Sequence, residues 1–224
     1  LRFPRGTSAG ECLHAIFEQI DFTVPTGWND AIGRGLSAHP QLVPGLRATE
    51  QSALLASMTT RMLNDVTRTT LTEGIVLASI PTTRRLTELK FSLPLPQLSA
   101  HALNAALMGL GYDVPRLAFH DLEGYLKGYI DLVFEHSGRY YLLDWKSNHL
   151  GYATSDYGPA GLQAAMAEHS YHLQYLLYSL AVDRYLRHRV PSYRHDTHFG
   201  GVLYLFVRGV RPDWVNADGT QAGV

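Results

Sequence analysis

Two neighbouring segments in the middle of the chain, residues 128–134 and 140–145, are mostly apolar, and each contains one acidic residue. Both segments are rich in aromatic and branched aliphatic residues, which favour β-strands, and His136-Ser137-Gly138-Arg139 between them is typical of a turn. The pattern therefore predicts a β-hairpin. If its turn is centred on Ser137-Gly138, with a loop of either two or four residues, the numbers of paired residues sum to 275.

This register places two acidic residues opposite each other, Asp131 on the first strand and Asp144 on the second. Since side chains alternate along a strand, Lys146 joins the two carboxylates on one face. The opposite face is apolar and is expected to lie against the core; it carries Ile130, Leu132, Phe134, Tyr141, Leu143 and Trp145. A slip of one residue would exchange the two faces, so burial favours this register.

Two carboxylates opposite each other would repel and destabilise the sheet unless a positive charge lay between them. Hard oxygen ligands suit Mg²⁺ or Mn²⁺, and a nearby lysine could orient an attacking water molecule. An ordinary solvent-facing hairpin with scattered charges is the commoner explanation of an isolated D-x-K. The opposed Asp131 favours the metal site here.

The rest of the chain predicts helices and further strands. Ser8-Ala9-Gly10-Glu11 resembles a capping box, so a helix should begin near Ser8. The glycines and prolines of residues 26–44 predict a loop with short pieces of structure. Helical spacing or helix-end signals predict helices over residues 49–66, 99–110, 159–168 and 170–189. A strand is predicted over residues 85–91, ending before Pro94 and Pro96. The apolar run near the end of the chain predicts a last strand over residues 201–207.

This alternation of strands and helices predicts an α/β fold with a central mixed β-sheet flanked by helices. Gln174 and Tyr178 lie one turn apart on the late helix, where polar edging of an apolar helix is the simpler explanation. His14 by itself is weak evidence, because a lone helical histidine is more often a packed or surface residue. Glu88, in the strand before the hairpin, is a second-rank site candidate.

The composition, 46% hydrophobic and 17% charged over 224 residues, predicts one ordinary globular domain spanning 1–224. The start without methionine and the polar last residues suggest a piece of a longer protein. The single cysteine, Cys12, excludes an internal disulfide and a multi-cysteine zinc site. No apolar run reaches membrane-spanning length, so we expect a cytoplasmic protein without membrane contact.

The net charge of −1 argues against a protein that holds nucleic acid by overall charge alone. If the protein cuts DNA, another protein or domain would have to deliver the strand. One local basic cluster is equally compatible with a solvated helix end and with a contact to a nucleic-acid backbone; it comprises Arg184, Arg187, His188, Arg189 and Arg194.

An ordered series of motifs runs through most of the chain. It begins with Phe3-Pro4-Arg5-Gly6, Leu13-His14 and Phe17-Glu18, continues with the hairpin segments 126–134 and 140–148, and ends with Leu173-Gln174-Tyr175, residues 185–189 and residues 198–202. This series resembles the nuclease domains of the RecB family within the PD-(D/E)XK nuclease superfamily. A shared D-x-K alone would be unspecific, whereas the ordered series is strong.

The resemblance implies a role for each candidate residue. His14, Asp131 and Asp144 would bind Mg²⁺ together with the backbone carbonyl of Trp145, and Lys146 would be the catalytic lysine. Gln174 and Tyr178 match the Q-x-x-x-Y motif that lines the site near the DNA backbone, and Glu88 matches an acidic position of less settled role. Trp145 and Ile130 depart from the tyrosine and proline common at these positions, and neither change removes a ligand.

The resemblance further implies a Mg²⁺-dependent exodeoxyribonuclease, with Mn²⁺ as a substitute. It would act on single-stranded DNA supplied by an attached helicase, with RecC-type and RecD-type partners, in processing double-strand breaks for recombinational repair. No G-x-x-x-x-G-K phosphate-binding loop occurs in these residues, so the helicase would lie elsewhere.

Two alternatives remain open. A catalytically silent nuclease fold, kept as a scaffold or docking surface, would be marked by a lost ligand or lysine, and all of them are present. A different metal-dependent phosphoesterase, such as an RNase or a structure-specific endonuclease, is compatible with the same site chemistry.

Overall fold

The computed structural model describes residues 3–111 and 116–224. Its helices are α1 (Thr7–Gln19), α2 (Trp28–Ala38), α3 (Ala48–Arg68), α4 (Ala100–Gly109), α5 (Pro159–Glu168), α6 (Tyr171–Arg189) and the short α7 (His195–His198). Its strands are β1 (Arg85–Leu98), β2 (Leu122–His136), β3 (Arg139–Lys146) and β4 (Phe199–Phe206). Short 3₁₀ turns cover Pro25–Gly27, Thr72–Gly74, Leu77–Ser79, Thr82–Arg84 and Thr154–Tyr157.

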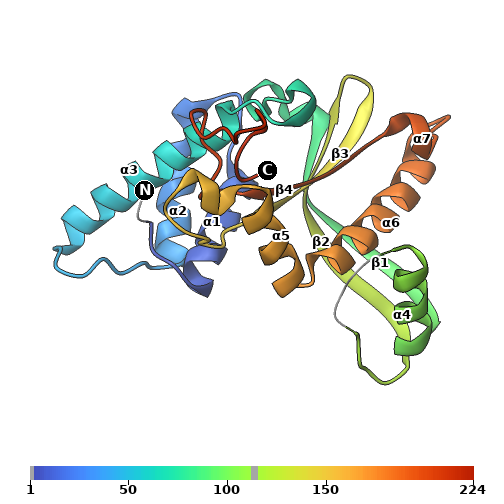
Figure 1. Cartoon of the computed structure of the whole chain (residues 1–224). Coiled ribbons are helices and arrows are strands. Elements are labelled where there is room, and N and C mark those ends of the chain that lie inside the picture. Colours follow the sequence, from blue (N-terminus) through green and yellow to red (C-terminus); the bar gives the residue numbers. More distant parts are fainter. Residues whose placement is uncertain (1–2, 112–115) are drawn as a thin grey trace.

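The four strands form one mixed sheet in the order β1-β2-β3-β4. The first three strands pair antiparallel with their neighbours, and β4 pairs parallel with β3. The helices lie on both faces, with α1, α2 and α3 gathered on one side and α6 on the other (Figure 1). The predicted α/β fold with a mixed sheet flanked by helices is thus confirmed.

The two largest apolar clusters of the described residues lie on opposite faces of the sheet. The larger core joins α1, α2 and α3 to one face, where Phe17 stacks on Trp145 with ring centroids 4.3 Å apart. The smaller core joins α6 to the opposite face through residues such as Val182 and Leu142. Among the residues that the structure describes, none of the helices is both long and apolar enough to cross a membrane.

The predicted loop over residues 26–44 is wrong, because α2 occupies Trp28–Ala38. One of the glycines that discourage an isolated helix here, Gly35, serves packing. A Cβ on Gly35 would lie 2.4 Å from Cγ1 of Ile16, so only glycine allows α2 to approach α1 this closely.

The helix predicted to begin near Ser8 begins at Thr7, but the predicted capping box is wrong, since Gly6, with a φ of 100°, is the N-cap and no side chain caps the helix. The strand predicted to end before Pro94 continues to Leu98. Because β1 is an edge strand, the N–H that proline lacks is not required by a second neighbour, so proline is tolerated there.

The last residues of the sequence, although polar, pack against the end of the sheet. Ala222 is fully buried, and the Phe206 N–H donates a hydrogen bond to the Gly223 carbonyl at 2.8 Å. The segment therefore packs at the end of β4, which itself lies at the edge of the sheet.

Candidate active site

The turn of the central hairpin fixes the register of its two strands. Ser137 and Gly138 both adopt left-handed backbone conformations, with φ of 52° and 79°, as a two-residue hairpin turn requires. Leu132 pairs with Leu143, and Phe134 with Tyr141. The predicted sum of 275, in its two-residue-loop form, is confirmed.

The paired ladder ends immediately before the two acidic residues. Asp131 and Asp144 lie just beyond the Leu132–Leu143 pair, and the Asp131 carboxylate accepts a hydrogen bond from the Trp145 N–H at 2.8 Å. The strands thus part at this point, and the side chain of one strand contacts the backbone of the other.

The predicted alternation of faces breaks at the same point. Ile130, expected beside Trp145, instead joins the core under α6. On the neighbouring strand Glu88 has a left-handed φ of 48°, and regular pairing omits it and Asp131. This local irregularity turns Asp131 toward α1, whereas Asp144 faces α6, so the predicted single shared face is wrong although the two carboxylates remain neighbours.

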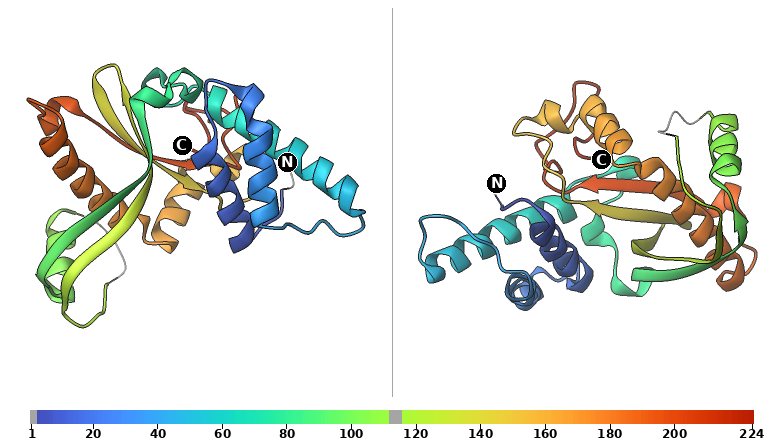
Figure 2. Two further views of the ribbon diagram at one scale, coloured as in Figure 1. Left: turned by 180° about the vertical axis from the view of Figure 1, so that it is seen from behind. Right: turned by 90° about the horizontal axis from the view of Figure 1, so that it is seen from below.

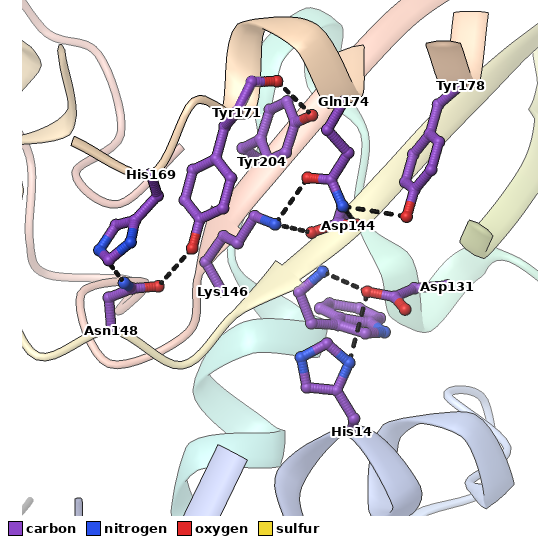
Figure 3. A network of polar contacts seen from close by, with 11 residues as sticks. His14, Asp131, Asp144, Lys146, Asn148, His169, Tyr171, Gln174, Tyr178 and Tyr204 are labelled. Atoms are coloured by element: carbon purple, nitrogen blue, oxygen red, sulfur yellow. Dashed lines mark hydrogen bonds and ion pairs between the residues drawn. The ribbon is translucent and has the colours of Figure 1, made fainter. Parts of the chain in front are cut away.

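Asp144 and Lys146 form a buried ion pair on one face of β3. Lys146 Nζ lies 2.5 Å from Asp144 Oδ2, with side-chain exposures of 8% and 4% (Figure 3). The ammonium also donates to Gln174 Oε1 at 2.8 Å and lies 3.7 Å from the centroid of the Tyr171 ring. The lysine is therefore held by an anion, an amide and an aromatic face at once.

Burial raises the pKa of Asp144 to about 6, and repulsion from Asp131 adds to this, while Lys146 opposes it. Although Lys146 lies close, Asp144 Oδ2 accepts no hydrogen bond of acceptable geometry from the described residues. A buried carboxylate oxygen without a hydrogen-bond donor is well suited to bind a divalent cation, so the chemistry of this site fits Mg²⁺ or Mn²⁺.

His14 reaches the site from α1, as the resemblance implies. Its Nδ1 lies 3.5 Å from Asp131 Oδ2. Burial lowers the pKa of His14, but the hydrogen bond and charge of Asp131, with the charge of Asp144, outweigh burial and raise the pKa overall. The histidine thus lies in the field of both carboxylates.

Gln174 and Tyr178 come from α6 and lie one behind the other. Gln174 Nε2 donates to Asp144 Oδ1 at 3.3 Å and to the Tyr178 hydroxyl at 2.9 Å. Burial raises the pKa of Tyr178 to about 12. Gln174 thus contacts both Asp144 and Lys146, whereas Tyr178 supports Gln174.

Glu88 lies beside the site in a pocket of about 220 Å³. The pocket is lined by Glu11, His14, Ala15, Glu18, Glu88, Asp131 and Trp145. Partial burial raises the pKa of Glu18, and the charges of Glu88 and Asp131 raise it further. Sequence reasoning missed Glu11 as a lining residue, although residues 11, 14 and 18 lie on one side of a helix.

Two aromatic residues of the site gave no signal in the sequence. Tyr171 begins α6 and Tyr204 lies on β4, and their ring centroids are 5.8 Å apart on the same side of Lys146. The Tyr171 hydroxyl donates to Asn148 Oδ1 at 3.3 Å. Only the packing of three separate elements brings these groups to the lysine (Figure 3).

No group of three or more histidine, cysteine or acidic side chains is arranged to hold a metal ion within residues 3–111 and 116–224. Asp144 is turned to Lys146 and Asp131 to the Trp145 N–H. The residues that could supply ligands are His14, Asp131, Asp144 and the Trp145 carbonyl, and their assignment as ligands stays a prediction.

Comparison with known proteins gives a consistent match. A family model described as the PD-(D/E)XK nuclease superfamily matches residues 2–213. The chain is similar to "RecBCD enzyme subunit RecB" of Escherichia coli, with 41% identity over 213 residues, which are 93% of this chain and 17% of that protein.

The proteins of the same name from Haemophilus influenzae and Mycobacterium tuberculosis are 35% and 34% identical to the chain. These matches cover 94% and 92% of this chain, and 17% and 21% of the relatives. The chain thus spans about a fifth of the length of the curated relatives it matches.

Proposed function

This chain belongs to the PD-(D/E)XK nuclease superfamily, and on that premise we propose that it is a Mg²⁺-dependent exodeoxyribonuclease that hydrolyses phosphodiester bonds of single-stranded DNA. Nucleases of this superfamily generally depend on divalent metals. The observation that carries the proposal is the Asp144–Lys146 pair beside Asp131, at the point where β2 and β3 part.

The ligands of the ion would be Asp131, Asp144, the Trp145 carbonyl and His14. When bound, Mg²⁺ supplies positive charge at a phosphate oxygen and lowers the pKa of a water molecule. With Asp144 among these ligands, the Lys146 ammonium would be free to turn toward substrate while Gln174 continues to hold it.

Lys146 would orient the attacking water and offset negative charge that develops on the phosphate. Gln174 accepts a hydrogen bond from Lys146 through its Oε1 and donates one to Asp144 through its Nε2, so it fixes these two side chains relative to each other. Tyr178 receives the second N–H of that amide and keeps it from rotating. Glu88 would lie beside the incoming strand in the acidic pocket.

The relatives are named as subunits of an enzyme called RecBCD. By analogy, we propose that this domain belongs to a longer cytoplasmic helicase-nuclease chain, that it works with RecC-type and RecD-type subunits, and that the assembly processes double-strand breaks for recombinational repair. The attached helicase would supply the single strand.

The test is degradation of labelled single-stranded DNA by the 224-residue chain with Mg²⁺. We expect cutting that EDTA abolishes and that Asp144→Ala reduces by several orders of magnitude. Asp30→Ala, which removes an exposed carboxylate on α2, is the matched control and should cut normally. Cutting by Asp144→Ala at the normal rate would refute the site.

Two further arms address the alternatives. Labelled RNA and a branched duplex of the same length should be cut more slowly than single-stranded DNA, and a preference for either would favour the other phosphoesterase. Asp131→Asn should weaken the Mg²⁺ affinity sharply, and unchanged affinity would argue against the two-carboxylate site. No cutting of any substrate would leave two explanations, dependence on missing partner subunits or a silent scaffold.

A further inference from the structure

The two-stranded ribbon formed by β1 and β2 beyond the sheet centre has two unlike faces. Its inner face packs against α6 through Leu89, Phe91, Leu93, Leu126 and Ile130. Its outer face carries exposed residues, which are Lys90, Ser92, Pro94, Tyr125, Lys127 and Tyr129. From behind, the ribbon passes in front of α4 and α6, and no helix of the described chain covers it (Figure 2, left).

Aromatic and cationic side chains alternate on this outer face. Tyr125 and Tyr129 are 69% and 51% exposed, and Lys127 lies between them in sequence. Tyr129 pairs across the ribbon with Lys90, whose Nζ lies 5.8 Å from the centroid of the tyrosine ring. The sequence contains three lysines, so two of them stand on this face and the third is Lys146.

The same face leads into the candidate active site. Glu88 lies two residues from Lys90 on β1, and Asp131 lies two residues from Tyr129 on β2. Both line the pocket that also contains His14. At about 3.3 Å per residue, Tyr125 lies roughly 20 Å along the strand from Asp131. The outer face is therefore continuous with the pocket that contains Glu88 and Asp131.

Resting on the proposed nuclease function, we propose that this outer face is a binding track for single-stranded DNA. Unpaired bases stack on the rings of Tyr125 and Tyr129, while Lys90 and Lys127 contact the phosphates between them. Base–aromatic stacking tolerates any sequence, and lysines track the backbone. A duplex keeps its base faces stacked inside, so the track selects single strands and leads them toward Asp131.

Ion pairs reduce the charge that the basic cluster at the end of α6 can offer to phosphates. There Arg187 is paired with Asp183 at 2.7 Å, and Arg194 lies 3.5 Å from Asp196. No ion pair with an acidic side chain is found for Lys90 or Lys127 among the described residues, so both ammonium groups can meet phosphates. A chain with a net charge of −1 needs such a local site to hold DNA.

Binding is measured first, without cleavage, by fluorescence anisotropy of a labelled oligothymidylate longer than the ribbon, in EDTA and low salt. Replacing both tyrosines, Tyr125→Ala with Tyr129→Ala, should weaken the affinity by about tenfold for each ring. The double phenylalanine variant keeps both rings and should bind as the unmodified chain does. Lys90→Gln with Lys127→Gln should reduce the slope of log affinity against log salt by about 0.7 per lysine.

Two substitutions away from the ribbon serve as matched controls. Leu42→Ala removes a side chain that is 78% exposed, and Arg61→Gln removes an exposed charge from α3. Neither should change oligothymidylate binding. The proposal is overturned if the unmodified chain fails to bind, or if the double alanine variant binds as tightly as the controls.

Cleavage with Mg²⁺ separates this proposal from the nuclease proposal. The double alanine variant should show a raised KM on the oligonucleotide with little change in kcat, since its substitutions lie away from Lys146. If the chain cuts the oligonucleotide but the ribbon substitutions leave its binding unchanged, the nuclease proposal stands and the track is refuted. Ribbon-dependent binding without cutting by the unmodified chain would support the track and would count against a nuclease that works without the proposed partner subunits.

Discussion

Lys146 has surroundings that a neutral side chain of similar length could keep. Its ammonium lies 3.7 and 5.0 Å from the ring centroids of Tyr171 and Tyr204, which a methionine thioether can also contact, and its charge meets Asp144 and Gln174. We therefore expect Lys146→Met to fold and to lower the rate of DNA cutting by about a hundredfold to a thousandfold. Single-turnover cleavage, with a melting curve for each protein, measures both effects.

Arg61→Gln on α3 removes a positive charge outside the site and should cut DNA normally. Full activity of Lys146→Met would show that the assigned chemistry is wrong. Unchanged Mg²⁺ affinity in the inactive variant would place its defect in catalysis rather than in metal binding.

The raised pKa of Asp144 predicts how metal-free stability depends on pH. Folding raises this pKa from 3.8 to about 6, so the folded carboxyl holds its proton more tightly than the unfolded one. Ionisation then favours the unfolded state, and this group makes the free energy of unfolding fall as pH rises from about 4 to about 6. Asp144→Asn should therefore gain stability relative to the unmodified chain across that window.

Urea unfolding at several pH values in EDTA checks this expectation, with Asp30→Asn as a control that should show no such window. A relative stability of Asp144→Asn that falls as pH rises would contradict it. At neutral pH, Mg²⁺ should raise the melting temperature of the unmodified chain by binding its folded state, and should do so much less for Asp144→Asn.

Residues whose positions follow from local alternation could be predicted from the sequence. Asp144 and Lys146 lie two apart on a regular strand, and a countable turn brings Asp131 near them. Ile130 could not be placed, because the break in alternation depends on the conformation of Glu88 on another strand. Tyr171 and Tyr204 likewise meet Lys146 only through tertiary packing.

At the scale of elements, the hairpin turn is open to improvement. Ser137 adopts a φ of 52°, which costs energy for serine, whereas asparagine tolerates this conformation and is preferred before glycine in such turns. Ser137→Asn should raise the free energy of unfolding by about 0.5 kcal/mol without changing the active site. Urea unfolding monitored by circular dichroism measures this gain.

Ser37→Asn, an exposed position on α2, is the comparison and should show no gain. A loss of stability in Ser137→Asn would mean that the serine hydroxyl contributes more to the turn than its backbone conformation costs.

Elements with a strong period were predicted, and those shaped by close approach were not. The helices predicted over residues 159–168 and 170–189 agree with α5 and α6 to within a residue. Helix α2 was missed because its glycines resemble loop signals, although Gly35 is the residue that allows close contact with α1. Strand β1 outruns its prediction because an edge position tolerates Pro94.

At the scale of the whole molecule, Arg208 connects two segments that are far apart in the sequence and lie next to the candidate active site. Its guanidinium donates to the Phe3 and Pro4 carbonyls at 2.9 and 2.6 Å, and to the Ser147 carbonyl at 2.7 Å. It thereby fastens the segment before α1 to the residue after Lys146. Arg208→Met should lower the free energy of unfolding by about 2 to 4 kcal/mol, because three carbonyls lose a charged donor.

Thermal and urea unfolding measure the loss for Arg208→Met. Arg34→Met removes an exposed arginine that donates only to Gln19 on the surface, and it should change stability by less than about 0.5 kcal/mol. Equal effects of the two substitutions would show that Arg208 does not link these segments.

The burial of Lys146 makes amine chemistry a direct reporter of the site. Lys90 and Lys127 are exposed and should react quickly with an amine-acylating reagent, whereas Lys146, 7% exposed and paired with Asp144, should react slowly. Peptide mass spectrometry would resolve all three sites, since the chain contains no other lysine. Labelling of Lys146 as fast as that of Lys90 would contradict this packing, and faster labelling on adding Mg²⁺ would record its release from Asp144.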